Sequence, residues 1–167
     1  AESYKVDPVH SSIVFSIKHL DVSNTYGRFN GATGTVEYDA ANPALSSFDV
    51  QVQAKNIDTA VPQRDQHLRS ADFLDVEKFA IISFKSTSVK PASEDALEVT
   101  GDLTLHGETK PITVTLKKTG QGQDPQGKNR IGFETQFTIN RTEYGMKPFP
   151  GVGDEVHLTV ALEAIQD

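Results

Sequence analysis

The sequence predicts an all-β fold, an antiparallel barrel of about eight strands that is interrupted by one short helix. Three observations predict it. Apolar and polar residues alternate with period two in segment after segment, as they do in strands with one buried face. The connections between these segments are mostly short, and there is no long crossover of the kind that parallel strands require. Residues 56–84 depart from the pattern with a run of charges that suits a helix, and residues 140–154 form a second irregular segment.

The first predicted strand is Ser12–His19, in which the alternation places Ile13, Phe15, Ile17 and His19 on one face. Further along the chain the same alternation recurs, with turn-forming residues between the segments. These further strands are predicted at residues 25–38, 46–54, 81–89, 96–105, 112–116, 131–139 and 156–164.

Glycine-rich segments shape the rest of the predicted barrel. Gly27, Gly31 and Gly34 fall inside the second predicted strand, where they favour the bulges and bends that a closing barrel needs. Residues 119–129 contain three glycines and a proline, which predicts a flexible surface loop. A two-sheet sandwich would show the same alternation, so it remains the alternative architecture. The interior of a barrel of this size is either filled by side chains or holds one small ligand.

The helical insertion is predicted at residues 59–72. Thr59 can cap its start, and Pro62 suits the first turn because its missing N–H would have no intrahelical partner there. Asp65 and Arg69 stand acid before base at i and i+4, so they are expected to pair along the helix. A helix of roughly ten residues is too short to be stable alone in water, so it must dock on the rest of the protein.

One face of this helix carries groups that could recognise a ligand. Arg64, His67 and Leu68 have the i, i+3, i+4 spacing of a shared face, and Leu68 and Phe73 would anchor it. An arginine offers a planar fork of hydrogen-bond donors that matches phosphate, and the N-terminus of a helix adds a favourable dipole.

Length and composition restrict the classes of function. At 167 residues the chain is predicted to form a single domain, residues 1–167, with a sizeable core. The net charge of −7 argues against nucleic acid or an anionic membrane surface as the main partner. No apolar stretch approaches the roughly 18 residues that a membrane-spanning helix needs. The absence of cysteine excludes disulfides and thiolate metal sites.

Motifs for catalysis and metal binding are missing from the sequence. The histidines stand singly, without the spacing of paired metal ligands, at positions 10, 19, 67, 106 and 157. There is no glycine-rich phosphate loop and no G-x-S-x-G elbow. Asp65 and His67 do not form an acid–base pair, because residues at i and i+2 do not face each other on a helix. The sequence therefore predicts no catalytic residue, no bound metal and no cofactor, and it favours a binding protein over an enzyme.

Several motifs together indicate a family. The longest is RDQHLRSADF at residues 64–73, and a second is GDLTLHGETKP at residues 101–111. They are accompanied by Asp7, His10-Ser11, Phe15 through Leu20, Gly27-x-Phe29, Phe84 and Asn140-Arg141. On these residues the chain resembles, nearly from end to end, the YceI-like family of lipocalin-like polyisoprenoid-binding proteins. It departs from the family at Phe79, which is followed by Ala80 where the family usually has an aromatic–proline pair.

The resemblance implies an extended, lipocalin-like, eight-stranded barrel that binds a long-chain isoprenoid lipid for transport or storage. It implies ligands such as a polyprenyl phosphate or ubiquinone, and a periplasmic or secreted location. A chain that begins at Ala1 and has Met146 as its only methionine agrees with removal of a signal peptide or with an expression boundary. A homodimer is left open. The competing hypotheses are an enzyme acting on isoprenoid lipids and a ligand-free structural or stress-response protein.

The expected ligand-binding residues come from the strands and from the insertion. Arg64 and His67, with His19 at the end of the first strand, are expected to meet the polar end of the ligand at the mouth. The tail is expected to contact Phe15, Ile17, Leu68, Phe73, Phe84, Phe133 and Phe137. Two structural alternatives remain. Each phenylalanine could be ordinary core, and Arg64 could pair with Asp72 or Asp75 merely to fix the helix.

Overall fold

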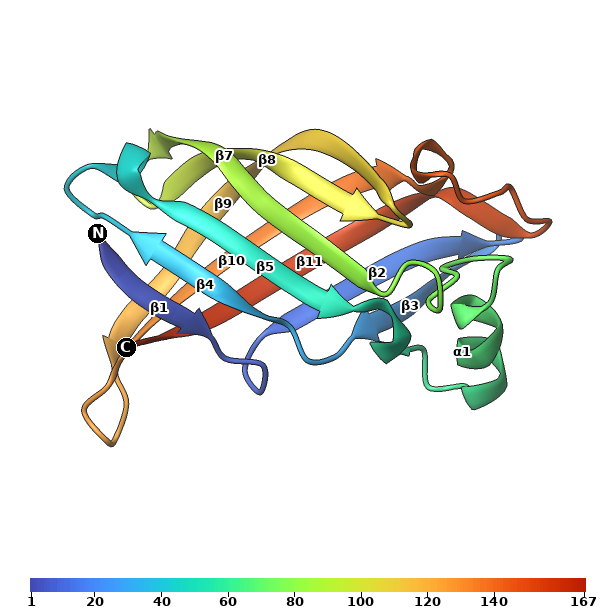
Figure 1. Cartoon of the computed structure of the whole chain (residues 1–167), viewed down its shortest axis with the longest axis horizontal. Helices are drawn as coiled ribbons and strands as arrows, with labels where there is room; N and C mark the ends of the chain where they lie inside the picture. Colours follow the sequence, from blue (N-terminus) through green and yellow to red (C-terminus); the bar gives the residue numbers. More distant parts are fainter.

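The computed structural model describes the whole chain, residues 1–167, as one β-sheet closed into a barrel (Figure 1). Its strands are β1 (Glu2–Val6), β2 (Ser12–His19), β3 (Ser23–Phe29), β4 (Thr33–Tyr38), β5 (Ser47–Gln53), β6 (Ile57–Asp58), β7 (Ile81–Ser93), β8 (Ala96–Leu105), β9 (Glu108–Gln123), β10 (Asn129–Asn140) and β11 (Val152–Gln166). The connections contain the α-helix α1 (Pro62–Arg69) and the short 3-10 helices η1 (Pro43–Leu45), η2 (Ala54–Asn56) and η3 (Arg141–Tyr144). None of these helices has the length and apolar character that crossing a bilayer requires.

Eight of the eleven strands form the closed ring, in the order β1-β4-β5-β7-β8-β9-β10-β11, and β11 pairs with β1 to complete it. All the pairings are antiparallel. β11 is long enough to pair with β1 near its end and with β2 over its first part, so β1 and β2 follow one another along it. The predicted fold class is confirmed. The sandwich is excluded because a closed ring has no second sheet.

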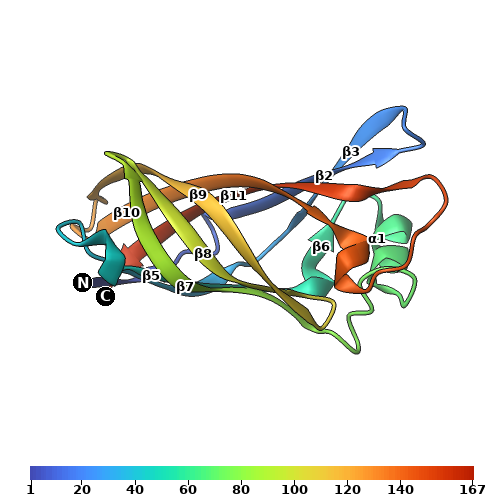
Figure 2. The same ribbon diagram turned by 90° about the horizontal axis from the view of Figure 1, so that it is seen from above.

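The ring is less complete at one end. There β3 pairs with β2 on one side, and on the other side only with the short β6, through Arg28–Asp58 and Phe29–Ile57. Because β3 does not pair with β5, the β2–β3 hairpin leaves the ring at the end of the barrel where α1 lies (Figure 2). Both chain termini lie at the opposite end (Figures 1 and 2).

Three details differ from the sequence prediction. β1 was not predicted, because only Tyr4 and Val6 of its residues are buried and so short a run gives a weak alternation. The predicted strand at 25–38 is two strands, β3 and β4, separated where Gly31 adopts a left-handed φ of 83°. The predicted loop at 119–129 is wrong over most of its length, since β9 runs to Gln123 and β10 begins at Asn129.

Two apolar clusters fill the barrel from opposite ends. The cluster near the termini contains Phe48 and Phe133, whose rings meet edge to face with centroids 5.2 Å apart. The cluster near α1 contains Phe15, Leu105 and Met146. Between the two clusters the inward-facing side chains are only partly buried, which points to unfilled space in the middle of the barrel.

Candidate functional site

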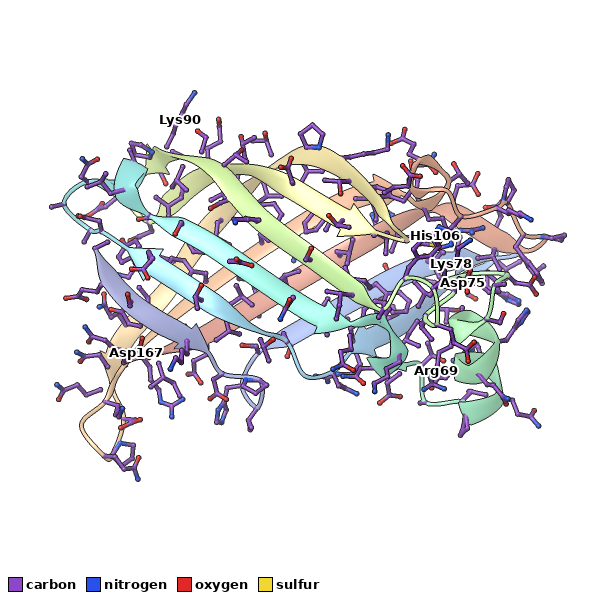
Figure 3. All side chains as sticks on the ribbon, viewed as in Figure 1. Arg69, Asp75, Lys78, Lys90, His106 and Asp167 are labelled. Carbon is purple, nitrogen blue, oxygen red and sulfur yellow. The ribbon has the colours of Figure 1, made fainter.

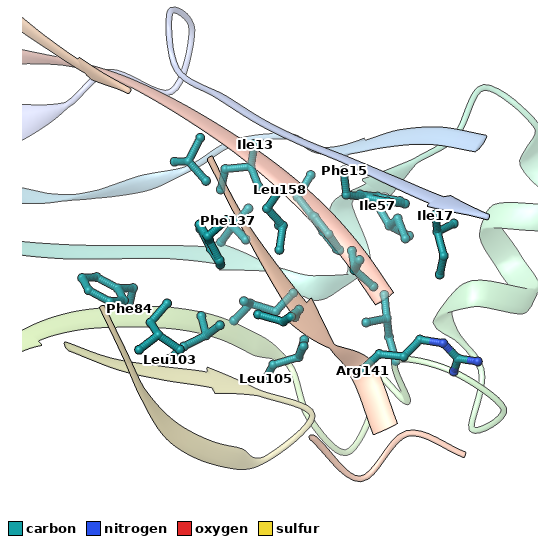
Figure 4. A pocket seen from close by; sticks show the side chains of 18 of the residues that line it. Ile13, Phe15, Ile17, Ile57, Phe84, Leu103, Leu105, Phe137, Arg141 and Leu158 are labelled. Atoms are coloured by element: carbon teal, nitrogen blue, oxygen red, sulfur yellow. The ribbon is translucent and has the colours of Figure 1, made fainter. Parts of the chain in front are cut away.

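The interior of the barrel contains an elongated apolar cavity of about 390 Å³. It is lined by 36 residues, of which 27 are hydrophobic. Figure 4 shows apolar side chains from several strands converging on it, among them Ile13, Phe84, Leu103, Phe137 and Leu158. The volume falls within the roughly 300–1,000 Å³ that is typical of small-molecule sites. The barrel therefore has room for one apolar ligand.

The alternation of the strands accounts for this lining. Side chains at every second position of a strand point to the same face of the sheet, and in a closed barrel one face is the interior. Phe84, Ile112, Phe137 and Val160 point inward and pack against both apolar clusters, yet each remains partly exposed. An inward side chain retains accessible surface only where it lacks neighbours, so these four residues border the empty part of the interior.

The cavity reaches the surface at the end that carries α1. There its lining includes Lys18 and His19 from the β2–β3 hairpin and Arg64 from α1, all of which are exposed. Figure 3 shows further charged and polar side chains at this end, including Arg69, Asp75, Lys78 and His106. We refer to the opening that Lys18, His19 and Arg64 surround as the mouth.

The charged groups of the lining have one sign. Its titratable residues are Lys18, His19, Arg64 and Arg141, and it contains no aspartate or glutamate. The chain as a whole has 23 acidic and 16 basic residues, so the lining reverses the overall charge balance. A cavity with this composition suits a ligand whose apolar part lies inside and whose polar end accepts hydrogen bonds.

Thr59 is the residue that fixes the start of α1. Its backbone N–H donates to Asp65 Oδ1 at 2.9 Å, and its hydroxyl donates to the same carboxylate. Arg64 Nε donates to Thr59 Oγ1 at 2.8 Å, and Arg64 Nη2 donates to the Thr59 carbonyl at 2.7 Å. Thr59 therefore does not cap the helix as predicted; the N-cap is Val61, and Pro62 occupies the first turn as expected.

The predicted pairing of Asp65 with Arg69 is wrong. Asp65 is buried, and its carboxylate accepts hydrogen bonds from Thr59. Arg69 Nε instead donates to the Lys55 carbonyl at 2.8 Å, which ties the end of the helix to the segment before β6. The proposed pairing of Arg64 with Asp72 or Asp75 is also wrong, because Arg64 binds Thr59.

His67 lies beside the mouth in a small aromatic cluster. Its Nε2 is 2.8 Å from Asp72 Oδ2, and its ring packs edge to face on Phe73, with centroids 5.0 Å apart. The ring of Phe149 contacts both, at centroid distances of 5.5 Å from His67 and 4.9 Å from Phe73. This cluster joins the end of α1 to the segment that precedes β11.

Arg141 is a buried cation in the cavity lining. It begins η3, whose start is capped by the Asn140 side chain, which accepts a hydrogen bond from the Thr142 amide at 2.9 Å. Arg141 Nε donates to the Gly153 carbonyl and Nη1 to the Lys147 carbonyl, each at 2.9 Å. In Figure 4 its guanidinium lies at the edge of the apolar side chains.

The other terminal nitrogen of Arg141 has no hydrogen-bond partner. The side chain is only 3% exposed, and the nearest carboxylate oxygen, Asp154 Oδ1, is 3.7 Å from Nη2. Burial lowers the pKa of Arg141 from its ordinary value, and the charge of Asp154 offsets this effect only in part. The Phe73 ring centroid is 5.8 Å from the guanidinium carbon. A buried donor without an acceptor is costly, and such groups recur at functional sites.

Of the ten residues predicted to bind a ligand, the structure places eight in the cavity lining. These are Phe15, Ile17, His19, Arg64, Leu68, Phe73, Phe84 and Phe137. His67 lies outside the lining because its ring turns toward Phe73 and Phe149. Phe133 lies outside because Phe48 and Tyr38 enclose it in the packed end of the barrel.

Sequence reasoning missed Arg141 as a site residue. Its neighbour pair Asn140-Arg141 was noticed as a motif, but no period or spacing indicated that the arginine turns inward. One signal could have identified it. Arg141 follows the long alternating run at 131–139 and continues its period, so it falls in line with the inward-facing, mostly apolar positions.

A second cluster of polar groups lies away from the mouth, at the turn between β1 and β2. Asp7, His10 and Glu163 have ligand atoms within 4.8 Å of one another, a spacing that could hold a metal ion. Arg130 Nη1 already contacts this cluster, at 2.9 Å from Asp7 Oδ2 and 3.3 Å from Glu163 Oε2. The arginine supplies the positive charge that a metal would bring, so the donor set fits a metal poorly.

The same cluster fixes the charge state of Asp7. Burial alone would raise the pKa of this carboxyl, but hydrogen bonds from His10, the Val9 amide and Arg130 hold the pKa below its ordinary value. Asp7 therefore stays ionised and links the turn between β1 and β2 to β10.

These features define a class of protein, a closed antiparallel barrel of lipocalin-like architecture with an apolar cavity open at one end. The family follows from comparison with known proteins. The YceI-like domain model matches residues 4–164, and this chain belongs to the YceI-like family. A UPF0312 protein of Pseudomonas aeruginosa (strain LESB58) is 43% identical over 169 residues, an alignment that covers 99% of this chain and 88% of that protein.

Solved structures show the same fold. BcnA of Burkholderia cenocepacia superposes with a TM-score of 0.86 at 22% identity, over 95% of this chain and 98% of that chain. A polyisoprenoid binding domain from Saccharophagus degradans, implicated in plant cell wall breakdown, superposes with a TM-score of 0.78 at 14% identity, over 100% of both chains.

Proposed function

We propose that this protein binds a long-chain isoprenoid lipid, with the tail inside the barrel and the polar end at the mouth. The observation that carries the proposal is the cavity, an apolar space of about 390 Å³ in a chain of ordinary size. Natural cores are packed nearly without voids, and cavities carry a cost in stability that grows with their volume. A ligand that fills the space offsets that cost. The polyisoprenoid binding domain with the same fold supports an isoprenoid rather than another apolar ligand.

The proposal includes polyprenyl phosphates and ubiquinone as ligand classes and carriage or storage of the lipid as the role. It includes a periplasmic or secreted location, and no cofactor other than the bound lipid. The proposed role is binding without catalysis, and the titratable groups of the lining are Lys18, His19, Arg64 and Arg141. A homodimer is compatible with the proposal but is not required by it, since one chain forms the whole cavity.

Extraction of the purified protein tests the proposal. An organic extract of protein prepared from its native host is separated by chromatography and analysed by mass spectrometry. We expect an isoprenoid lipid at close to one equivalent per chain. The protein denatured before purification and refolded without lipid is the control, and it is expected to yield none.

Other outcomes assign the alternatives. If the native extract holds no lipid and the refolded protein takes up neither ubiquinone nor a polyprenyl phosphate, the ligand-free structural role is correct. If incubation converts the bound lipid to a product, the protein is an enzyme. Fractionation of the host cells separately tests the proposed location.

A further inference from the structure

The structure points to an anionic polar end on the ligand, and we propose that Arg141 is the residue that selects it. This inference rests on the proposed function and goes beyond it, because an isoprenoid with a neutral head group would satisfy the proposed function equally well. The ligand class is an amphiphile whose head is a phosphate or a carboxylate. The shared chemistry is a charged oxygen that accepts a hydrogen bond from Arg141 Nη2.

The first argument is the free donor. Two nitrogens of the Arg141 guanidinium are used by the carbonyls of Gly153 and Lys147, which fix the plane and direction of the group. The remaining nitrogen, Nη2, is buried and has no hydrogen-bond partner, only Asp154 Oδ1 at 3.7 Å, and the residue itself belongs to the cavity lining. A donor that is held in place before the ligand arrives loses little conformational entropy on binding.

The second argument is the fixation of this donor by its surroundings. Gly153 lies where the pairing of β11 with β2 shifts register, between Val152 and Val156, so its carbonyl is free to accept from Arg141. Bulges of this kind re-aim groups beside functional sites. On the other side, the Phe73 ring is 5.8 Å from the guanidinium carbon and restricts its movement. The arginine thus cannot turn away from the cavity to find water.

The third argument is charge. The titratable residues that line the cavity are Lys18, His19, Arg64 and Arg141, without a single carboxylate. The one acid close to Arg141 is Asp154, whose Oδ1 is 3.7 Å from Nη2 and whose side chain is 52% exposed. A neutral carbonyl would satisfy Nη2 but would leave the buried charge compensated only in part, by Asp154. An anionic oxygen accepts the hydrogen bond and also compensates the buried charge. Charge-assisted hydrogen bonds are roughly twice as strong as neutral ones.

The geometry also separates Arg141 from the residues first expected to meet the head group. Arg64 uses Nε and Nη2 on Thr59, and His67 is engaged by Asp72 and lies outside the lining. Arg64, Lys18 and His19 are exposed, so they contribute a favourable potential at the mouth that salt screens. Arg141 is shielded from solvent, and its contribution is less sensitive to salt.

Three ligands with one tail provide the test: farnesyl phosphate, farnesoic acid and farnesol. Their dissociation constants for refolded, lipid-free protein are measured by isothermal titration calorimetry at low and at high salt. We expect both acids to bind at least tenfold more tightly than farnesol at low salt. Arg141→Met is expected to reduce this preference about ten- to one-hundred-fold, the effect of one charge-assisted hydrogen bond, and to weaken farnesol binding less than it weakens the binding of either acid.

Matched variants provide the controls. Arg28→Met removes an exposed arginine on β3 that is absent from the cavity lining, so the preference for acids is expected to persist. Asp154→Asn removes the carboxylate 3.7 Å from Nη2 and is expected to increase the preference. If Arg141→Met fails to fold, Asp154→Asn and the ligand series on the unaltered protein still decide the question. The two acids differ in charge and shape, so the tighter of them identifies phosphate or carboxylate as the natural head.

The outcomes separate this inference from the proposed function. Equal binding of farnesol and the two acids overturns the anionic head group and leaves isoprenoid binding intact. A preference for acids that survives Arg141→Met, or that Asp154→Asn fails to increase, overturns the assignment to Arg141. Binding of none of the three compounds, together with a lipid-free native extract, refutes the proposed function itself.

Discussion

Substituting Val160 by tryptophan distinguishes an empty barrel from a packed one. Val160 lies on β11, lines the cavity and packs against both apolar clusters, so a larger side chain at this position would extend into the middle of the barrel. The chain has no tryptophan of its own, so the new indole would also be a unique fluorescent reporter of the cavity.

The expected magnitude follows from the area that the ring would bury. An enclosed tryptophan buries roughly 100 Å² more apolar surface than valine, which at about 25 cal/mol per Å² corresponds to about 2.5 kcal/mol. In a filled core the same ring would be overpacked, at a cost of about 1–3 kcal/mol. We therefore expect the free energy of unfolding of lipid-free Val160→Trp to stay constant or to rise by up to about 2.5 kcal/mol.

Urea denaturation followed by circular dichroism measures the stability, and uptake of the apolar dye N-phenyl-1-naphthylamine measures the free cavity. We expect dye uptake to fall sharply in Val160→Trp. Val36→Trp is the matched control, because Val36 is fully buried and absent from the cavity lining; it should lose about 1–3 kcal/mol. Losses of equal size in the two variants, with no dye uptake by the unaltered protein, would refute the existence of usable internal space.

Three further predictions concern the polar anchors. Asp65→Ala leaves the buried Thr59 amide without its acceptor, so thermal denaturation should show a loss of about 1–3 kcal/mol, and Asp65→Asn a smaller one; an unchanged melting temperature contradicts this. Because the pKa of Asp7 is lowered by folding, its carboxylate stabilises the protein above about pH 4 and this contribution is lost as pH falls through the lowered folded pKa. Asp7→Asn should therefore lower the free energy of unfolding at pH 7 and make it depend less on pH in the acidic range. An unaltered dependence of the unfolding free energy on pH would contradict a stabilising role for ionised Asp7. Prolonged EDTA treatment should leave the melting temperature constant; a drop that zinc alone restores would place a metal among Asp7, His10 and Glu163.

Much of the fold could be predicted because the alternation in the long strands is regular. β2 and β8 were predicted with the bounds that the structure shows, since every second residue is apolar through β8 and through β2 as far as Ile17. The predicted strand ends were wrong where pairing with a neighbouring strand, and not the alternation of apolar residues, determines how far a strand extends. β9 and β10 extend past the core into residues 119–123 and 129–130, where most side chains are exposed and polarity no longer alternates. Backbone pairing and polar contacts of single side chains, such as those of Arg130, maintain the strands there.

The site was less predictable than the fold, for a physical reason. A charged helix in a β protein is visible in the sequence, and it does lie at the mouth. Which of its polar groups are free depends on contacts between distant segments. Thr59 forms hydrogen bonds with both Arg64 and Asp65, and no periodicity in the sequence could indicate these contacts. The position of Arg141 is fixed by two carbonyls, that of Lys147 in the segment after η3 and that of Gly153 in the irregular start of β11.

The pairing of β1 with β11 sets the order in which the protein can be completed. Lys5 pairs with Ile165, so the ring cannot close until nearly the whole chain has been synthesised. The entropic cost of joining distant segments grows only slowly with their separation, but pairings this remote in sequence slow folding. Until β11 is available, β10 and the β1–β2 segment expose unpaired strand edges, which are prone to aggregate. A growing chain therefore exposes these edges to intermolecular pairing until the fifteen residues of β11, Val152–Gln166, are available.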